Sequence, residues 1–204
     1  MTIYDLKPAF QNLLRPIVRF LNKAGVTPNQ VTLMTCLLSI FYSVAIYKEL
    51  HHLFIMFLPL FFFIRMALNA IDGLLAKEHD MMTPRGAMLN EITDVVSDTF
   101  LYLSLSVFSV IDNQNIVFFS FIAIFTEVSG LSSLHIGSGR RFDGPFGKSD
   151  RAFFISVLAL LVTFTSIEKL VYDYLFYISF VLLGTTVVNR MNKAIKALKD
   201  VQTR

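Results

Sequence analysis

Acidic and amide side chains recur at helical spacing on two consecutive apolar segments. Asn69 and Asp72 lie near the end of one segment, and Asn90, Asp94 and Asp98 follow at every fourth residue of the next. Residues three or four apart share one face of a helix, so each set forms a polar stripe. A charged side chain inside a bilayer costs at least about 2.5–3.5 kcal/mol, so clustered acids in apolar segments indicate a functional site.

Carboxylate and amide oxygens are the ligands that hard divalent cations prefer. The sequence has a single cysteine, Cys36, and no Cys/His cluster that would favour zinc. We therefore predict an Mg²⁺ or Mn²⁺ site formed by the two stripes: Asn69, Asp72, Asn90, Asp94 and Asp98. Hydrogen bonds between helices are the structural alternative. A proton- or ion-coupled carrier is a functional alternative, because intramembrane acids also form relays.

The segments that carry these stripes belong to a strongly apolar chain. Of its 204 residues, 54% are hydrophobic and only 16% are charged, against about 25% charged in soluble domains. This composition excludes a soluble enzyme, a disordered chain and a nucleic-acid binder. A spanning helix needs about 20 apolar residues. We predict an all-α membrane protein with six transmembrane helices near 29–49, 53–76, 87–111, 114–137, 152–167 and 170–192.

Residues 1–28 differ from the six-helix domain predicted for 29–204. Arg15, Arg19 and Lys23 recur every four residues, and leucine, isoleucine and valine side chains fall largely opposite them. This pattern predicts an amphipathic helix that lies in the membrane interface.

Lysine and arginine set the expected orientation, because cytoplasmic loops carry an excess of them. With six spans, both termini share a side with the loops that follow the second and fourth spans. The basic residues on that side are Lys7, Arg15, Arg19, Lys23, Lys77, Arg85, Arg140, Arg141, Lys148, Arg151, Arg190, Lys193, Lys196, Lys199 and Arg204. The opposite side has only Lys48 and Lys169. We therefore expect both termini in the cytoplasm.

The spacing of the stripes resembles that of a known family. CDP-alcohol phosphatidyltransferases carry the pattern D-x2-D-G-x2-A-R-x8-G-x3-D-x3-D. Here Asp72-Gly73 precedes Ala76-Lys77, and Gly86, Asn90 and Asp94 follow at the same intervals. The turn Thr27-Pro28-Asn29, the interfacial leader and the six-span layout are also similar to the family. The stretches 65–70 and 144–151 resemble a bacterial inner-membrane branch of it.

The resemblance implies an enzyme that moves a phosphatidyl group from CDP-diacylglycerol to an alcohol and releases CMP. It implies a divalent metal, a homodimer and a bacterial inner (cytoplasmic) membrane location. By the same resemblance, Asp94 is the general base. The CDP moiety is bound by Asp72, Gly73, Ala76, Lys77 and Gly86.

Three positions depart from the family pattern. Asn69 and Asn90 stand where it has aspartates, and Lys77 stands where it has arginine. An amide oxygen can ligate a metal but brings no charge. Three outcomes remain open: one metal suffices, an acid such as Glu91, Asp98 or Glu127 supplies the missing charge, or the protein is a non-catalytic member of the family.

Basic residues near the fifth and sixth spans suggest how the acceptor alcohol binds. Lys148 and Arg151 follow Gly147 at the expected start of a helix, where free N–H groups and cations favour phosphate. Relatives place acceptor-phosphate cations in this region, and Arg190 lies near the end of the last span. We expect a phosphorylated acceptor, with glycerol 3-phosphate as first choice. The positive-inside rule alone is the competing explanation for these residues.

Overall fold

The computed structural model describes residues 3–202, and the side chains of residues 8–199. Within 3–202 the secondary structure is helical, and no strand occurs there. The helices are α1 (Ile3–Lys23), α2 (Pro28–Tyr47), α3 (Leu53–Met56), α4 (Leu58–Glu78), α5 (Pro84–Leu103), the 3-10 helix η1 (Ser104–Val107), α6 (Asn113–His135), α7 (Lys148–Phe164) and α8 (Lys169–Gln202). The all-helical prediction is thus confirmed.

The helix bounds depart from the predicted spans in three places. The second span begins as the short helix α3 and restarts as α4, where Pro59 is the second residue and needs no hydrogen-bonded N–H. The third span ends at Leu103 and continues as η1. The last helix, α8, runs ten residues beyond the predicted end, through a basic segment that contains Lys193 and Lys196.

Four of the described helices are long and apolar enough to cross a membrane: α2, α4, α6, and α8 over Lys169–Lys199. The other two predicted spans, α7 and α5, are not both long enough and apolar enough. Helix α7 has only 17 residues. Helix α5 carries Glu91, Asp94 and Asp98 near its middle, and these lower its hydropathy.

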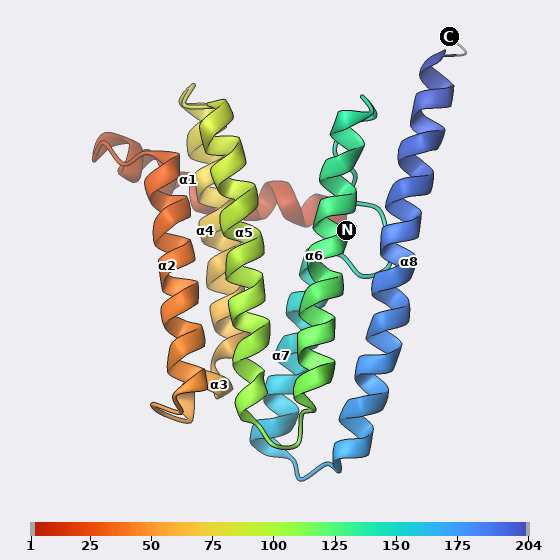
Figure 1. Cartoon of the computed structure of the whole chain (residues 1–204). Helices are drawn as coiled ribbons and strands as arrows, with labels where there is room; N and C mark the ends of the chain where they lie inside the picture. The colour runs from red at the N-terminus through yellow and green to blue at the C-terminus, as the bar shows by residue number, and fades with distance from the viewer. Residues whose placement is uncertain (1–2, 203–204) are drawn as a thin grey trace. The chain divides into compact units, whose positions relative to one another are not determined.

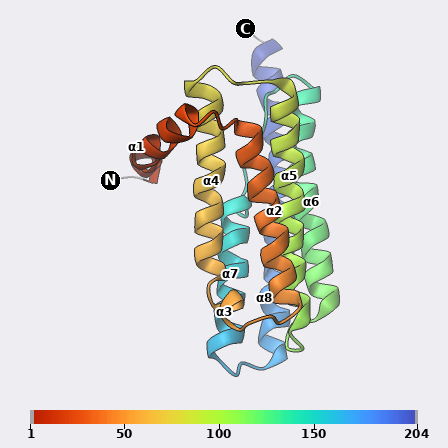
Figure 2. The same ribbon diagram turned by 90° about the vertical axis from the view of Figure 1, so that its left-hand side faces the viewer.

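The chain divides into two compact units. The first unit extends from the N-terminal end to Val44 and continues over Leu60–Leu101. In it α2, α4 and α5 run side by side, and α1 lies crosswise to α2 and α4 (Figures 1 and 2). The second unit comprises Ala45–Pro59 and the chain from Tyr102 onwards, and in it α6, α7 and α8 run side by side.

Helix α1 has two apolar sides. Leu14 and Val18 are buried in a cluster with Ile71, Leu74 and Leu75 of α4. Next to this contact runs a second apolar stripe that is exposed, formed by Leu13, Ile17 and Phe20. Arg15, on the polar side of the helix, pairs with Glu78 at 2.9 Å. Helix α1 therefore packs on α4 with one apolar stripe and exposes another.

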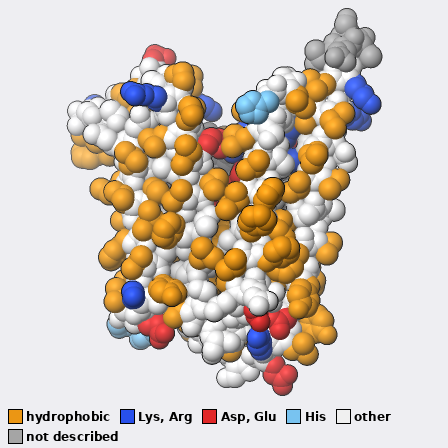
Figure 3. Space-filling model, viewed as in Figure 1, with side chains coloured by type: hydrophobic (Ala, Val, Ile, Leu, Met, Phe, Trp, Pro, Cys, Tyr) orange, Lys and Arg blue, Asp and Glu red, His pale blue; other side chains and the backbone are white. Residues whose placement is uncertain are grey.

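An aromatic core holds the second unit together. Phe119 of α6 contacts Phe146, Phe154 of α7 and Phe176 of α8, with ring centroids 5.4–6.4 Å apart. On the visible surface of each unit, hydrophobic side chains cover the middle and charged side chains gather towards the ends (Figure 3). This distribution is typical of membrane-spanning helices.

Candidate active site

A cavity of about 190 Å³ lies in the first unit, between residues of α2, α4 and α5 and the turn that joins the last two. It is lined by the residues Pro28, Asn29, Thr32, Asp72, Gly73, Ala76, Lys77, Met81, Met82, Thr83, Gly86, Ala87 and Asn90. Every residue that the sequence assigned to the CDP moiety therefore contacts one cavity. Asn69, Asp94 and Asp98 are not among its lining residues.

The side chain of Asp72 is fixed from α2. The Thr32 hydroxyl donates to Asp72 Oδ2 at 2.8 Å and also lies 3.0 Å from the carbonyl oxygen of Pro28. Both Thr32 and Asp72 are buried. Sequence reasoning missed Thr32. The available signal was its place at the start of a run of small hydroxyl residues at helical spacing, which continues through Thr35 and Ser39.

The start of α5 explains why position 86 carries glycine. The Thr83 hydroxyl accepts a hydrogen bond from the Gly86 N–H at 3.0 Å, and Pro84 occupies the first helical position, where no N–H is needed. A Cβ atom on Gly86 would lie 2.8 Å from Asn29 Oδ1 and 3.1 Å from Thr83 Oγ1. Glycine therefore allows α2 and α5 to approach each other at the cavity.

Next to these lining residues, the other acids of the stripes are held by a network. Asn69 Nδ2 donates to Asp94 Oδ1 at 2.8 Å. Arg65, only 3% exposed, forms a short hydrogen-bonded ion pair with Asp98. Its guanidinium also lies 3.3 Å from Asp94 Oδ1 and 3.3 Å from the Asp94 carbonyl oxygen. Arg65 of α4 thus pairs with two acids of α5, Asp94 and Asp98.

This network bears on how a metal could be held. Among residues 3–202, no three His, Cys, Asp or Glu side chains are close enough together to hold a metal ion. Asp98 is committed to Arg65, and Asn69 turns its amide N–H₂, not its oxygen, towards Asp94. Of the predicted ligands, Asp72, Asn90 and Asp94 remain as oxygen donors, and Glu91 follows Asn90 on α5. Two carboxylates and an amide fit one hard divalent cation. They do not supply the negative charge that two divalent cations would need.

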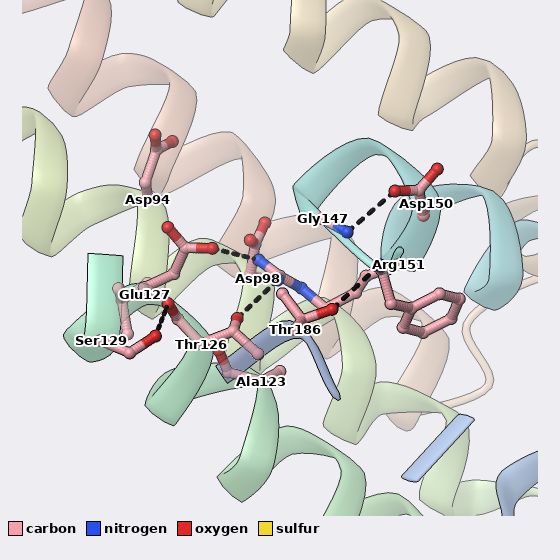
Figure 4. Close-up of polar contacts among 12 residues, drawn as sticks. Asp94, Asp98, Ala123, Thr126, Glu127, Ser129, Gly147, Asp150, Arg151 and Thr186 are labelled. Carbon is pink, nitrogen blue, oxygen red and sulfur yellow. Dashed lines mark hydrogen bonds and ion pairs between the residues drawn. The ribbon is translucent and has the colours of Figure 1, made fainter. Parts of the chain in front are cut away.

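The second unit contains a cluster of three arginines around one acid. Glu127 of α6 is 9% exposed, and its Oε1 lies 2.7 Å from Arg151 and 3.6 Å from Arg190. Its Oε2 lies 3.4 Å from Arg140. Figure 4 shows the Glu127 carboxylate directed at Arg151, with the Thr126 hydroxyl beside it. Three guanidinium groups therefore lie within 3.6 Å of one carboxylate.

Each arginine is also held by neutral groups. Arg151 is 1% exposed and donates to Thr126 Oγ1 at 2.7 Å and to the Tyr102 hydroxyl at 3.4 Å. Arg190 is 2% exposed and donates to the carbonyl oxygens of Thr126 and Asp143. Burial, together with the charge of Arg190, lowers the pKa of Arg140 below its usual value. The pKa of a cation is lowered in this way when it is buried and, to a smaller extent, when another cation lies near it.

The loop between α6 and α7 packs closely on its surroundings. A Cβ atom on Gly144 would lie 2.5 Å from Thr186 Cγ2, and Gly144 has a φ of 137° that favours glycine. The Phe146 N–H donates to Thr186 Oγ1 at 3.0 Å. The Asp150 carboxylate then accepts from the Gly147 N–H at 2.8 Å as α7 begins (Figure 4). These contacts position Lys148, which is half-buried in the first turn of α7.

Asp143 holds the other end of this loop to α8. Its carboxylate pairs with Arg141 at 3.0 Å and with Lys193 at 2.9 Å. Burial opposes the ionisation of Asp143, but the hydrogen bond from Lys193 and the charges of Arg141 and Lys193 lower its pKa. The predicted acceptor residues Lys148, Arg151 and Arg190 all lie in this second unit.

Comparison with known proteins identifies the family. The model of the CDP-alcohol phosphatidyltransferase family matches residues 25–189, which is most of the chain. The chain belongs to the CDP-alcohol phosphatidyltransferase family. Its members are transferases, and the family generally uses a divalent metal.

The chain is also similar to two individual proteins and to one solved structure. The chain is 39% identical to the inner membrane protein YnbA of Escherichia coli K12, over 93% of this chain and 94% of that one. It is 33% identical to an uncharacterized protein of Aquifex aeolicus VF5, over 60% and 61% of the two chains. Its fold matches that of phosphatidylinositol phosphate synthase (PgsA1) from Mycobacterium tuberculosis with CDP-DAG bound. That match has a TM-score of 0.70 at 19% identity and covers 88% of this chain and 92% of that one. The phosphatidyltransferase fold therefore accounts for nearly the whole chain.

Proposed function

We propose that this phosphatidyltransferase moves a phosphatidyl group from CDP-diacylglycerol to a phosphorylated alcohol, with glycerol 3-phosphate as first choice, and releases CMP. The observation that carries the proposal is the cavity of the first unit. Residues from three helices, far apart in sequence and matching the family pattern, line it together. The CDP-DAG bound to the related mycobacterial synthase supports the choice of donor.

In this proposal the cavity binds the CDP moiety through Asp72, Gly73, Ala76, Lys77 and Gly86. Gly73 leaves the backbone of α4 uncovered, because no atom lies within 4 Å of the position where its Cβ would be. Lys77 is exposed at the end of α4 and offers a cation to the diphosphate. Thr32 keeps Asp72 in one orientation.

Asp94 is the proposed general base. Its side chain is 23% exposed, accepts a hydrogen bond from Asn69 at 2.8 Å and lies 3.3 Å from the Arg65 guanidinium. The oxygen of the acceptor hydroxyl attacks the phosphorus of the phosphatidyl group. As it does so, the hydroxyl proton passes to Asp94. The bond from that phosphorus to the oxygen of the CMP phosphate breaks, and CMP leaves with the electron pair.

A divalent cation, Mg²⁺ or Mn²⁺, would be held by Asp72, Asn90 and Asp94. When bound, it neutralises the diphosphate and the charge that develops on the leaving group.

The cations gathered around Glu127 support an anionic acceptor. One carboxylate faces three guanidinium groups, and Lys148 adds a further cation in the same unit. A phosphate can accept hydrogen bonds from two or more such cations, whereas an amino alcohol would gain nothing from them. We therefore assign Lys148, Arg151 and Arg190 to binding of the acceptor phosphate.

The membrane arrangement is part of the proposal. We infer six spans, formed by α2, α4, α5, α6, α7 and α8, with both termini in the cytoplasm of a bacterial inner membrane and the protein a homodimer. The four apolar helices and the inner-membrane relative support the location. Labelling of single cysteines from either side of sealed vesicles tests it: Lys48→Cys should react from the periplasmic side and Lys196→Cys from the cytoplasmic side.

CMP release from CDP-diacylglycerol by purified protein tests the reaction. We expect release that depends on an added acceptor and that falls at least about 100-fold in Asp94→Asn, the scale of losing a general base. Asp112→Asn is the matched control and should retain activity, because it alters a half-buried carboxylate at the N-cap of α6, where asparagine also caps a helix. Unchanged turnover in Asp94→Asn would refute the base assignment. Absence of CMP release with every acceptor would favour a non-catalytic family member.

A panel of acceptors tests the phosphate assignment. Lys148→Ala should raise the KM for glycerol 3-phosphate more than the KM for CDP-diacylglycerol. Lys196→Ala removes an exposed lysine of α8 and should change neither. Equal turnover of unphosphorylated glycerol, or turnover with an amino alcohol alone, would exclude a phosphorylated acceptor.

A further inference from the structure

A buried cation, Arg65, lies among the acids of the two polar stripes. Arg65 of α4 is almost fully buried and forms ion pairs with two acids of α5, Asp94 and Asp98. It also donates to the carbonyl oxygen of Asp94. A buried guanidinium with contacts to both a side chain and a backbone has a fixed position. Its charge is therefore a permanent part of the site.

Asn69 completes this arrangement. Its amide nitrogen lies 2.8 Å from Asp94 Oδ1, which is the distance of a hydrogen bond. A carboxylate at position 69 would bring an anionic oxygen to about that distance from Asp94, and two anions so close repel unless a cation or a proton lies between them. With an amide there, Asp94 is stabilised by a hydrogen bond and needs no shared cation on that side.

We propose that Arg65 and Asn69 replace one metal ion, so that the site holds a single divalent cation bound by Asp72, Asn90 and Asp94. Asp98 anchors Arg65 and does not ligate the metal. Arg65 is a positioning residue, because it acts on the reaction through Asp94. The identity of the ion-binding site rests on the proposed function, but the number of ions rests on the contacts of Arg65 and Asn69.

The number of bound ions is the decisive measurement. Mn²⁺ is titrated into the purified protein in lipid nanodiscs, and free Mn²⁺ is followed by electron paramagnetic resonance. We expect one Mn²⁺ per chain. In Arg65→Met the charges of Asp94 and Asp98 lose their counter-charge, so a second Mn²⁺ should bind. Arg65→Lys keeps the charge and should bind one. Two ions in the unaltered protein, or one in Arg65→Met, would overturn the proposal.

A double variant covers the case in which Arg65→Met folds poorly. Arg65→Met/Asp98→Asn removes both members of the ion pair and should recover the melting temperature while it binds one Mn²⁺. If the double variant is as unstable as the single one, Arg65 serves packing and not charge compensation, and the proposal fails.

Asn69→Asp tests the other half of the arrangement with Arg65 intact. The new carboxylate should tighten Mn²⁺ binding at least about tenfold or add a second ion. The control is Asn115→Asp, because Asn115 donates to Asp173 at the same 2.8 Å in the second unit. That change should leave the Mn²⁺ titration unaltered. If Asn69→Asp is also without effect, the amide does not limit metal binding and the proposal fails.

These measurements separate two kinds of failure. Ion counting needs neither an acceptor nor turnover, so a protein that binds one Mn²⁺ and releases no CMP would contradict the proposed function alone. A protein that releases CMP and binds two ions would contradict only the role of Arg65 and Asn69.

Discussion

Removal of the charge on Glu127 should destabilise the second unit strongly. Glu127→Gln keeps the size of the side chain and an oxygen that can accept hydrogen bonds, but it removes the anion that faces Arg140, Arg151 and Arg190. Arg151 and Arg190 are almost fully buried, so water cannot replace the lost charge. The variant would deprive three guanidinium groups of the carboxylate that they share.

The size of the effect follows from these contacts. Breaking a buried ion pair by removing one partner costs about 3–5 kcal/mol. Arg151 and Arg190 keep hydrogen bonds to Thr126, so the lower end of that range applies. In a chain of this size, 1 kcal/mol shifts the melting temperature by about 2–4 °C. We therefore expect Glu127→Gln to melt about 6–12 °C below the unaltered protein.

Thermal unfolding in nanodiscs, followed by circular dichroism, measures this shift. Glu168→Gln is the control, because it removes an exposed carboxylate just before α8 and should leave the melting temperature within about 1 °C, as for most surface substitutions. Added glycerol 3-phosphate should stabilise Glu127→Gln more than the unaltered protein, since its phosphate supplies the missing anion. A melting temperature of Glu127→Gln within about 2 °C of the parent would refute the charge-balance reasoning.

Two further predictions concern the cavity of the first unit. Thr32→Val removes the hydrogen bond to Asp72 and should raise the KM for CDP-diacylglycerol several-fold, with little effect on that for the acceptor, in the CMP-release assay. Gly86→Ala places a methyl group against Asn29 and should weaken donor binding about tenfold in the same assay. The control Gly184→Ala meets no atom within 4 Å and should preserve binding, so equal effects of the two would exclude a steric role for position 86.

Spacing within one helix was the most informative feature of the sequence. The intervals between Asp72, Gly73, Ala76 and Lys77 place these residues on the cavity side of α4, and the structure brings Gly86 and Asn90 of α5 to the same cavity. A helical period states which residues share a face. The all-helical class was predictable for the same reason, since long apolar segments interrupted by short polar turns leave few other structures in a membrane.

The sequence did not predict which side chains pair between neighbouring helices. Arg65 had several acids within plausible reach, and periodicity does not tell which one it meets. The choice of Asp94 and Asp98 depends on how α4 and α5 are rotated against each other. In the same way, the bond from Thr32 to Asp72 depends on the packing of α2 on α4, and a threonine in an apolar segment carries no signal of its partner.

The two-sided packing of α1 has a practical consequence for handling the protein. Leu14 and Val18 of α1 rest on Ile71, Leu74 and Leu75, which flank the cavity residues of α4. In the proposed membrane arrangement, the neighbouring exposed stripe of α1 faces lipid. A detergent micelle presents a more curved and less ordered surface than a bilayer leaflet, so extraction removes support from a helix that braces the donor site. Purification in native lipid patches, without a detergent step, is therefore the appropriate way to prepare this enzyme for measurements of donor binding.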